Sequence, residues 1–264
     1  MRLTRALLGV VAAAVSVSGC AVFRSSQAPL TTHPLVDVRH SCVLVLLPGI
    51  GDEPTRFSEH GFAEAARNSP DPCDVVTVDA HFGYYRDAIV VERMVKDVLA
   101  PLRDQYERLW LVGVSLGGYG AALLAEQHPD LIDGLVLISP FLGVRSAVSP
   151  LVDRVEAAGG LRHYEGPFLK RSSPKRHFME VDAVWEWMAA RTRGEGGSKL
   201  VIAWGTADRF AWQHRVVGAA LDAEAAFVLP GGTHTWDTFG ELWRKVAATS
   251  PWRAAIGQPD LKGV

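Results

Sequence analysis

The chain is 264 residues long, with 48% apolar and 21% charged residues, which fits one folded globular domain and excludes a disordered tail, a collagen and a coiled coil. The formal net charge of −2 gives no long-range attraction for nucleic acid or for an anionic surface. Three cysteines are too few for a disulfide scaffold. Beyond the N-terminus no apolar run reaches the length of about 20 residues that a span needs, which excludes a protein with several membrane spans.

Residues 1–19 have the layout of a bacterial export signal. A positive start with Arg2 and Arg5 precedes a short apolar stretch and then small residues. The stretch ends in VSGC at Cys20, which resembles the lipobox of bacterial lipoproteins. The resemblance implies cleavage before Cys20 and acyl chains such as palmitate on that residue. More than one chain gives lasting anchorage, because each buried CH₂ contributes about 0.8 kcal/mol. The alternative is an ordinary signal peptide with a chance cysteine.

The resemblance also implies a location. Residue 21 is Ala rather than Asp, which under the sorting rule of bacterial lipoproteins favours the outer membrane. We therefore expect a protein of the bacterial cell envelope, lipid-anchored on the periplasmic face of the outer membrane. Residues 20–34 are small, polar and proline-containing, which predicts a short tether ahead of a folded domain over 35–264.

Two cysteines remain after the lipobox. An exported chain meets an oxidising compartment, where disulfides form and persist. Cys42 and Cys73 each stand directly before an apolar, β-like run. If these two strands are parallel neighbours, both sulfurs lie at the same end of the sheet, and we predict a Cys42–Cys73 disulfide. Two separate buried thiols are the alternative.

Short apolar runs rich in Val, Leu and Ile alternate with helix-like stretches along the chain. Such runs suit a parallel sheet that is covered on both faces. The alternation predicts an α/β domain with a mostly parallel sheet of about six strands flanked by helices. There is room for a short extra strand at 35–39. We expect strands at 42–47, 74–79, 109–114, 134–138, 199–204 and 225–229, and helices at 54–68, 85–106, 116–127, 211–222 and 237–248.

One segment breaks this alternation. Residues 143–198 contain no clear parallel strand, but they contain a basic stretch and a helix-like piece with Trp185 and Trp187. A connection of this length usually has a function or a structure of its own. We predict a cap or lid inserted over the carboxyl edge of the sheet. Its basic residues form either a solvated face or a contact for anionic substrates or head groups.

The sequence GVSLG at residues 113–117 is the motif that points to chemistry. It follows an apolar strand and opens a helix rich in Gly and Ala. A strand–turn–helix of this kind places Ser115 on a sharp elbow with its Oγ exposed. The flanking glycines avoid collisions with the neighbouring strand and helix. The N-terminus of the helix stabilises negative charge built nearby.

With this motif the chain resembles the α/β-hydrolase family, over nearly all of its length after residue 40. That family uses a serine, an acid and a histidine in this chain order. Asp208 follows the predicted strand at 199–204 and matches the acid, and His234 follows the strand at 225–229 and matches the histidine. The resemblance implies an α/β-hydrolase fold in which Ser115 is the nucleophile, His234 the general base and Asp208 the group that orients the imidazole.

Acyl transfer also needs preorganised donors for the developing oxyanion. The backbone N–H of Leu116, directly after the nucleophile, is the first donor. The family takes the second from the loop after an early strand, here LPGIGD at residues 47–52. We assign the N–H of Ile50, with Gly51 as the rival. The family often has His-Gly where this chain has Pro-Gly, which leaves the choice between the two residues open.

Other polar residues lack such a context. His81 is read as a plain loop residue rather than a pocket residue, His128 as a helix-end residue and His214 as helical surface. Asp237 lies three residues after His234, but its place in a terminal helix argues against it as the acid. The sequence has no H-E-x-x-H motif, no paired cysteine spacing and no G-x-G-x-x-G motif after the first strand. We therefore predict no metal and no other cofactor.

These features predict a serine hydrolase that is anchored in the envelope and cleaves a carboxylic ester or thioester through an acyl-enzyme. An acyltransferase on the same triad is an alternative, because water exclusion from the site decides between the two. A non-catalytic binding lipoprotein is another, because a fold does not impose a function. The expected partners are a small acyl-ester or thioester substrate and, through Cys20, a membrane, but no nucleic acid. The sequence does not indicate the oligomeric state.

Overall fold

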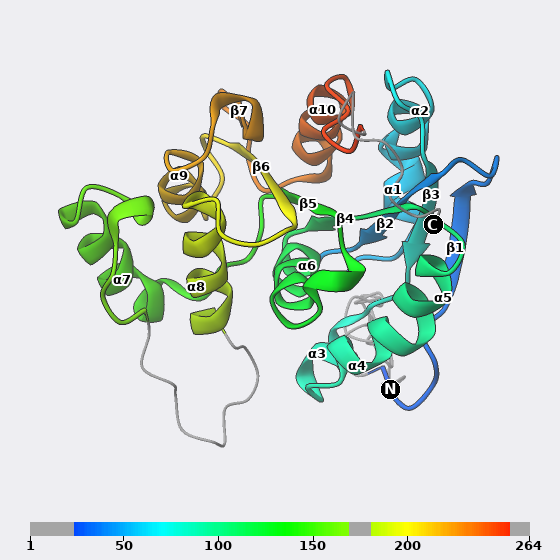
Figure 1. Cartoon of the computed structure of the whole chain (residues 1–264), viewed down its shortest axis with the longest axis horizontal. Coiled ribbons are helices and arrows are strands. Elements are labelled where there is room, and N and C mark those ends of the chain that lie inside the picture. Colours follow the sequence, from blue (N-terminus) through cyan, green and yellow to red (C-terminus); the bar gives the residue numbers. More distant parts are fainter. Residues whose placement is uncertain (1–23, 169–180, 254–264) are drawn as a thin grey trace, which may run out of the picture.

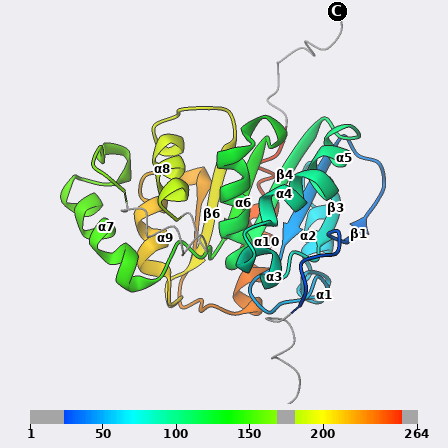
Figure 2. The same cartoon turned by 90° about the horizontal axis from the view of Figure 1, so that it is seen from below.

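The computed structural model describes residues 24–168 and 181–253. Their centre is a seven-stranded sheet in the order β1-β3-β2-β4-β5-β6-β7, with helices on both faces (Figures 1 and 2). β1 is antiparallel to β3, and all other neighbours are parallel. The strands are β1 (Thr32–Val36), β2 (Cys42–Leu47), β3 (Asp74–Val78), β4 (Arg108–Val114), β5 (Gly134–Ile138), β6 (Lys199–Gly205) and β7 (Ala226–Leu229).

The six parallel strands lie within one residue of their predicted positions, so the mostly parallel α/β sheet is confirmed. The extra strand lies three residues earlier than the predicted 35–39. The strand ends at Val36 because the next residues turn around the carboxylate of Asp74, which accepts the N–H groups of Val38 and Arg39, both at 3.0 Å. Arg39 has a φ of 66°, which no strand accommodates.

Two of the predicted helices are interrupted. The helix expected at 54–68 breaks at Gly61, which has a φ of 77°. The helix expected at 85–106 contains a left-handed residue at Ala88 and a π-helical turn at Val95–Leu99. The helices are α1 (Thr55–Glu59), α2 (Phe62–Arg67), α3 (Phe82–Arg86), α4 (Val90–Met94), α5 (Ala100–Arg103), α6 (Leu116–Gln127), α7 (Arg145–Ala157), α8 (Val181–Thr192), α9 (Ala211–Gly218) and α10 (Trp236–Ala247).

The sheet divides the apolar core into two clusters, one between each face of the sheet and the helices that cover it. α1, α2 and α10 cover one face, whereas α4, α6 and α8 lie over the other (Figure 1). β2 is buried along its whole length, because Val43, Val45 and Leu47 face one cluster and Leu44 and Leu46 the other. Two-sided burial explains why the central strands read as continuous apolar runs. No described helix is both long enough and apolar enough to cross a bilayer.

The segment predicted as a cap is only partly separate from the core. α8 packs beside α6 (Figure 1) and buries Val184, Trp185 and Met188 completely. The indole N–H of Trp185 donates to the carbonyl of Leu142 at 2.9 Å. α8 is therefore a sheet-covering helix, and the prediction of a cap over all of 143–198 is wrong for this part. No strand separates α7 from α8, so the apolar pattern of the sequence marks no boundary there. Residues 169–180 lie outside the described part of the chain.

The predicted tether is also shorter than expected, because residues from Arg24 onward are docked on the domain. The Arg24 guanidinium forms an ion pair with Asp79, and the hydroxyl of Ser26 donates to Asp87 at 2.5 Å. The N–H of Leu30 donates to Asp97 at 3.0 Å. From Arg24 to Leu30 the predicted tether therefore lies against the domain. Cys20 and the signal-like segment lie outside the described residues.

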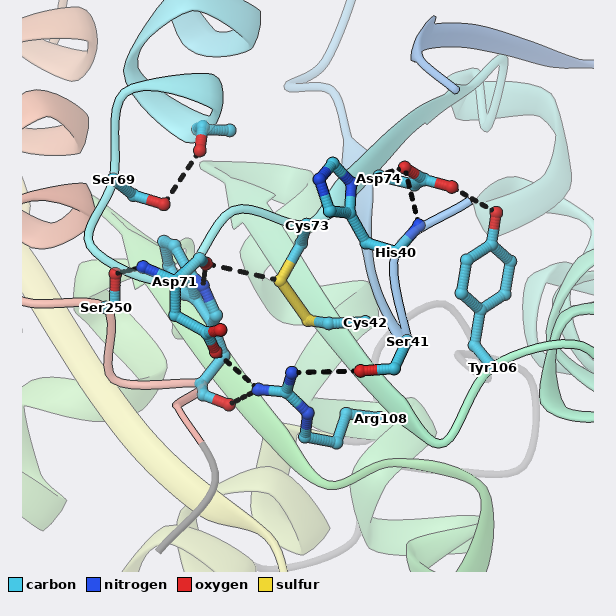
Figure 3. Close-up of a disulfide and its surroundings, with 12 residues drawn as sticks. His40, Ser41, Cys42, Ser69, Asp71, Cys73, Asp74, Tyr106, Arg108 and Ser250 are labelled. Atoms are coloured by element: carbon cyan, nitrogen blue, oxygen red, sulfur yellow. Dashed lines mark hydrogen bonds and ion pairs between the residues drawn. A yellow bond between two sulfur atoms is a disulfide. The ribbon is translucent and has the colours of Figure 1, made fainter. Parts of the chain in front are cut away.

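Cys42 and Cys73 form the predicted disulfide. β2 and β3 are parallel neighbours paired in the register Val43 with Asp74, so the two cysteines lie opposite each other at the amino edge of the sheet (Figure 3). The carboxylate of Asp74, next to Cys73, also accepts the Tyr106 hydroxyl at 2.8 Å and lies 2.7 Å from the His40 ring. This edge is therefore cross-linked by covalent and polar contacts.

Candidate active site

Ser115 stands on a strained turn between β4 and α6, with a φ of 51° and a ψ of −113°. Glycine is required on both sides. A Cβ on Gly117 would lie 2.1 Å from the carbonyl oxygen of Leu47, and one on Gly113 would lie 2.4 Å from the carbonyl oxygen of Gly117. These close approaches hold the serine at the carboxyl edge of the sheet, as the GVSLG motif predicts.

The three predicted catalytic side chains meet at this edge. His234 Nε2 lies 2.9 Å from Ser115 Oγ, and His234 Nδ1 lies 2.8 Å from Asp208 Oδ2. The residues come from the connections that follow β4, β6 and β7. Because these strands are parallel, their carboxyl ends bring the three side chains together although 119 positions separate the serine from the histidine. The geometry is that of a nucleophile, a base and an orienting acid.

The electrostatics keep the acid charged. Burial disfavours the Asp208 carboxylate, but the hydrogen bonds from His234 and from the N–H of Phe210, at 2.8 Å, outweigh burial and lower the pKa of Asp208. A charged carboxylate accepts a hydrogen bond from Nδ1–H and keeps the imidazole proton on Nδ1, which leaves Nε2 free to accept the proton of Ser115. The rings of Phe210 and Phe239 meet the imidazole edge-on, at 5.2 and 5.1 Å between centroids.

The predicted oxyanion donors come from elements beside Ser115. Leu116 is the first residue of α6, where backbone N–H groups have no acceptor within the helix. A Cβ on Gly49 would lie 3.4 Å from the Cβ of Ser115, so the loop after β2 runs beside the nucleophile. The N–H of Asp52 donates to Gly49 at 3.3 Å and closes a turn with Ile50 and Gly51 at its tip. The roles of the Leu116 and Ile50 N–H groups stay predictions.

Asp52 is a residue that sequence reasoning missed. Its Oδ1 accepts the indole N–H of Trp236 at 2.9 Å, so it links the turn after β2 to the segment that carries His234. Burial raises the pKa of Asp52, and the Trp236 hydrogen bond and the charges of Arg56 and His234 oppose the rise only in part. Asp52 and Trp236 each adjoin a recognised motif, but a sequence separation of 184 residues conceals the contact between them.

Three further histidines, His214, His81 and His128, have structural roles. His214, predicted as helical surface, is completely buried in α9, and its Nε2 lies 2.8 Å from the carbonyl oxygen of Pro140. That prediction is wrong, because α9 turns this position toward the sheet; burial lowers the pKa of His214 to about 4. His81 caps α3, where its Nδ1 accepts the N–H of Gly83 at 3.1 Å. His128 is the C-cap of α6, and Asp237 has a 95% exposed side chain.

A groove of about 780 Å³ opens beside the turn after β2. Gly51 and Asp52 line its inner end, and the paired side chains of Arg24 and Asp79 line another side. The described residues contain no cluster of three or more His, Cys, Asp or Glu side chains that could hold a metal ion.

Comparisons with known proteins agree with this architecture. The family model of the alpha/beta hydrolase fold matches residues 34–187. The monoacylglycerol lipase of Paleococcus ferrophilus superposes with a TM-score of 0.54 at 19% identity, over 83% of this chain and 97% of that one. The peroxisomal alpha-beta-hydrolase of Saccharomyces cerevisiae gives 0.54 at 15% identity, over 83% and 80%. Est1E from Butyrivibrio proteoclasticus, with bound ferulic acid, gives 0.51 at 17% identity, over 83% and 92%.

A curated relative gives a different and partial likeness. The tRNA modification GTPase MnmE of Rhizobium meliloti (strain 1021) is 29% identical over 117 residues, and the match covers 39% of this chain and 27% of that protein. The present sequence has no G-x-x-x-x-G-K-[ST] phosphate-binding motif, so this likeness carries no argument about activity. The hydrolase model, by contrast, matches more than half of the chain and agrees with the parallel sheet and the elbow at Ser115. The chain belongs to the alpha/beta hydrolase family.

Proposed function

We propose that this protein is a serine hydrolase that cleaves a carboxylic ester or thioester and is anchored in the cell envelope by acyl chains on Cys20. The observation that carries the catalytic part is the continuous hydrogen-bonded chain from Asp208 through His234 to Ser115. Membership of the alpha/beta hydrolase family supports the same reaction class. The anchoring part rests on the lipobox-like VSGC sequence.

The geometry supports a two-step reaction. Ser115 Oγ attacks the carbonyl carbon while His234 Nε2 takes the hydroxyl proton, and the N–H groups of Leu116 and Ile50 stabilise the oxyanion. Collapse breaks the bond to the leaving group, which takes the proton from His234 and departs as an alcohol or thiol. Water then attacks the acyl-serine, again with proton transfer to His234. The carboxylic acid leaves and Ser115 regains its proton.

The test of the catalytic part is labelling with a fluorophosphonate probe, which reacts only with an activated serine. Ser115→Ala removes the nucleophile, and Ser58→Ala, on an exposed serine of α1, is the matched control. We expect the parent and the Ser58→Ala variant to be labelled and the Ser115→Ala variant to stay unlabelled. Labelling of Ser115→Ala, or no labelling of a well-folded parent, would contradict the proposal. A panel of acyl esters of different chain length then defines the acyl preference.

The anchoring part has an independent test. Mass spectrometry of the mature protein should find an N-terminal Cys20 that carries acyl chains, and the protein should partition into detergent. Cys20→Ser should abolish both signals and leave the labelling of Ser115 unchanged. A mature N-terminus at another residue would refute the anchor and leave the catalytic proposal intact.

A further inference from the structure

The described chain begins and ends at opposite edges of the sheet (Figure 2). Arg24, its first residue, pairs with Asp79, which directly follows β3 at the carboxyl edge. This is the edge that holds the triad. At the other end of the described chain, the carbonyl oxygen of Trp252 accepts a hydrogen bond from the guanidinium of Arg108 at 2.6 Å. Arg108 is the first residue of β4, so this end lies at the amino edge. Arg24, where the described chain begins, therefore lies at the active-site edge.

The chain between Cys20 and this edge is short. Four residue steps separate Cys20 from Arg24, and an extended chain spans at most about 14 Å over that distance. The hydrogen bond from Ser26 to Asp87 and the one from Leu30 to Asp97 hold the following residues on the domain. An acylated Cys20 would therefore keep the active-site edge close to the membrane surface and would prevent the opposite edge from turning toward it.

The active-site edge also has the side chains that a lipid surface accommodates. Ile50, at the turn after β2, and Val144, directly before α7, are large apolar residues that are 50% and 56% exposed. Arg145 lies over the ring of Trp212 at 5.1 Å, and Arg209 lies over the ring of Phe210 at 4.9 Å. Within the described chain neither arginine forms a salt bridge. An exposed apolar side chain next to an arginine, as at Val144 and Arg145, suits an interface with anionic head groups.

We propose that the active-site edge lies against the anionic lipid surface of the membrane that carries the anchor, and that the substrate is a carboxylic ester of a bilayer lipid. The inference rests on the proposed function, because it takes acylation of Cys20 and hydrolysis at Ser115 as given. A tethered enzyme meets a lipid ester at a high effective concentration, which falls steeply as the tether lengthens.

The orientation can be measured directly on the lipidated protein. Because Cys42 and Cys73 form a disulfide and Cys20 carries the anchor, a new cysteine is the one free thiol available to a fluorophore. Val144→Cys places the probe on the active-site edge. Val38→Cys, at a residue 66% exposed near the amino edge, is the matched control. In phosphatidylethanolamine–phosphatidylglycerol vesicles with nitroxide-labelled lipid, we expect several-fold stronger quenching at position 144 than at 38. Equal quenching, or stronger quenching at 38, would overturn the orientation.

A spacer tests the substrate class. A flexible Gly/Ser insert of about 30 residues between Phe23 and Arg24 keeps the anchor but lets the domain rotate freely. The length dependence of tethering predicts that the rate of hydrolysis of an ester embedded in the vesicle falls on the order of tenfold. Hydrolysis of a water-soluble acetate ester should not change. An unchanged rate on the vesicle ester would overturn the inference alone. No turnover of the soluble ester by either protein would instead refute the hydrolase proposal, and an unacylated Cys20 would refute the anchor together with this inference.

Discussion

The two edges of the sheet differ in what their polar residues do. At the carboxyl edge, Ser115 and Ser139 have φ values of 51° and 46°, which are unfavourable for residues with a side chain. At the amino edge, the Cys42–Cys73 disulfide and the buried carboxylate of Asp74 cross-link neighbouring segments (Figure 3), and the left-handed residue there, Arg39, donates its N–H to Asp74. The carboxyl edge holds the candidate triad, with Ser115 as one of its left-handed residues, and the cross-linked amino edge holds nothing that the proposed reaction uses.

This difference suggests that the carboxyl edge mainly serves activity and the amino edge mainly serves stability. Left-handed non-glycine residues each cost about 1–3 kcal/mol and persist where the surrounding structure fixes them. The carbonyl of Ser115, for example, accepts the N–H of Phe141 at 2.8 Å, and the N–H of Ser139 donates to Ala203 at 2.8 Å. We expect changes at the carboxyl edge to alter turnover with little effect on unfolding. Changes at the amino edge should do the reverse.

The largest effect is expected from Asp208→Asn. The amide would no longer favour the tautomer that presents a free Nε2 to Ser115, and turnover should fall about 10³–10⁴-fold, as in other serine triads. The unfolding temperature should change by only a few degrees. Asp237→Asn, on an exposed acid of α10 close in sequence to His234, is the matched control and should keep full turnover. Equal losses in both variants would argue against Asp208 as the orienting acid.

The next effect concerns the disulfide. Replacing Cys42 and Cys73 together by Ser releases a loop with a sequence separation of 31 residues, which the chain-entropy relation values at about 3–4 kcal/mol of unfolding free energy. Denaturant unfolding of the double variant should show this loss, and reduction of the parent should reproduce it. Turnover by the folded fraction should stay near that of the parent. A large loss of turnover without a loss of stability would contradict the separation of the two edges.

Asp74→Asn should give a smaller, pH-dependent loss. Burial disfavours the Asp74 carboxylate, but hydrogen bonds from Val38, His40 and Tyr106 outweigh burial and lower its pKa. A lowered pKa stabilises the fold above the unfolded value of about 4, and that contribution disappears as the pH falls through the folded value. At pH 7 the variant should lose about 1–3 kcal/mol. The gap to the parent should close in acid; a constant gap from pH 7 to pH 3 would argue against the charge as its cause.

The two edges also differ in how well the sequence predicts them. The meeting of Ser115, Asp208 and His234 and the parallel strands were predictable because each of these three residues follows its own apolar run, and parallel strands bring their carboxyl ends together. The disulfide was predictable for the same reason, since Cys42 and Cys73 precede neighbouring strands. The position of β1 was not, because the turn that ends it depends on the carboxylate of Asp74, 35 and 36 residues away.

Contacts between distant segments account for the other errors. Small polar residues such as Ser26 resemble a linker in the sequence. In the structure the Ser26 hydroxyl donates a hydrogen bond to Asp87, 61 positions later. His214 resembles a surface residue because the short α9 has no clear apolar stripe, yet Pro140 lies against its ring. The sequence does not separate α8 from the predicted cap, because α8 follows another helix and no strand marks where it begins.

The smallest predicted effect lies at Asp52. This residue is at the carboxyl edge, but we expect its replacement to change both turnover and stability. Asp52→Asn keeps an oxygen for the Trp236 N–H but removes a negative charge that favours a protonated His234. A partly exposed charge–charge interaction of this kind is worth about 0.5–1 kcal/mol, so kcat/KM should fall roughly two- to fivefold. Trp236→Phe, which removes the donor and keeps the charge, is the comparison, and kcat/KM of the two variants separates the charge of Asp52 from its hydrogen bond.

The stability of the same variant should move in the opposite direction. Burial raises the pKa of Asp52, so the folded protein holds this proton more tightly than the unfolded chain does, and stability falls as the pH rises through the interval between the two values. Asp52→Asn should therefore be slightly more stable than the parent at pH 7 and equal to it below pH 4. Denaturant unfolding at both pH values measures the difference. If the variant gains stability and loses activity, the Asp52 charge, like the strained backbone of Ser115, is a feature of the carboxyl edge that lowers folding stability and serves activity. If the variant loses both, Asp52 is a purely structural link to Trp236.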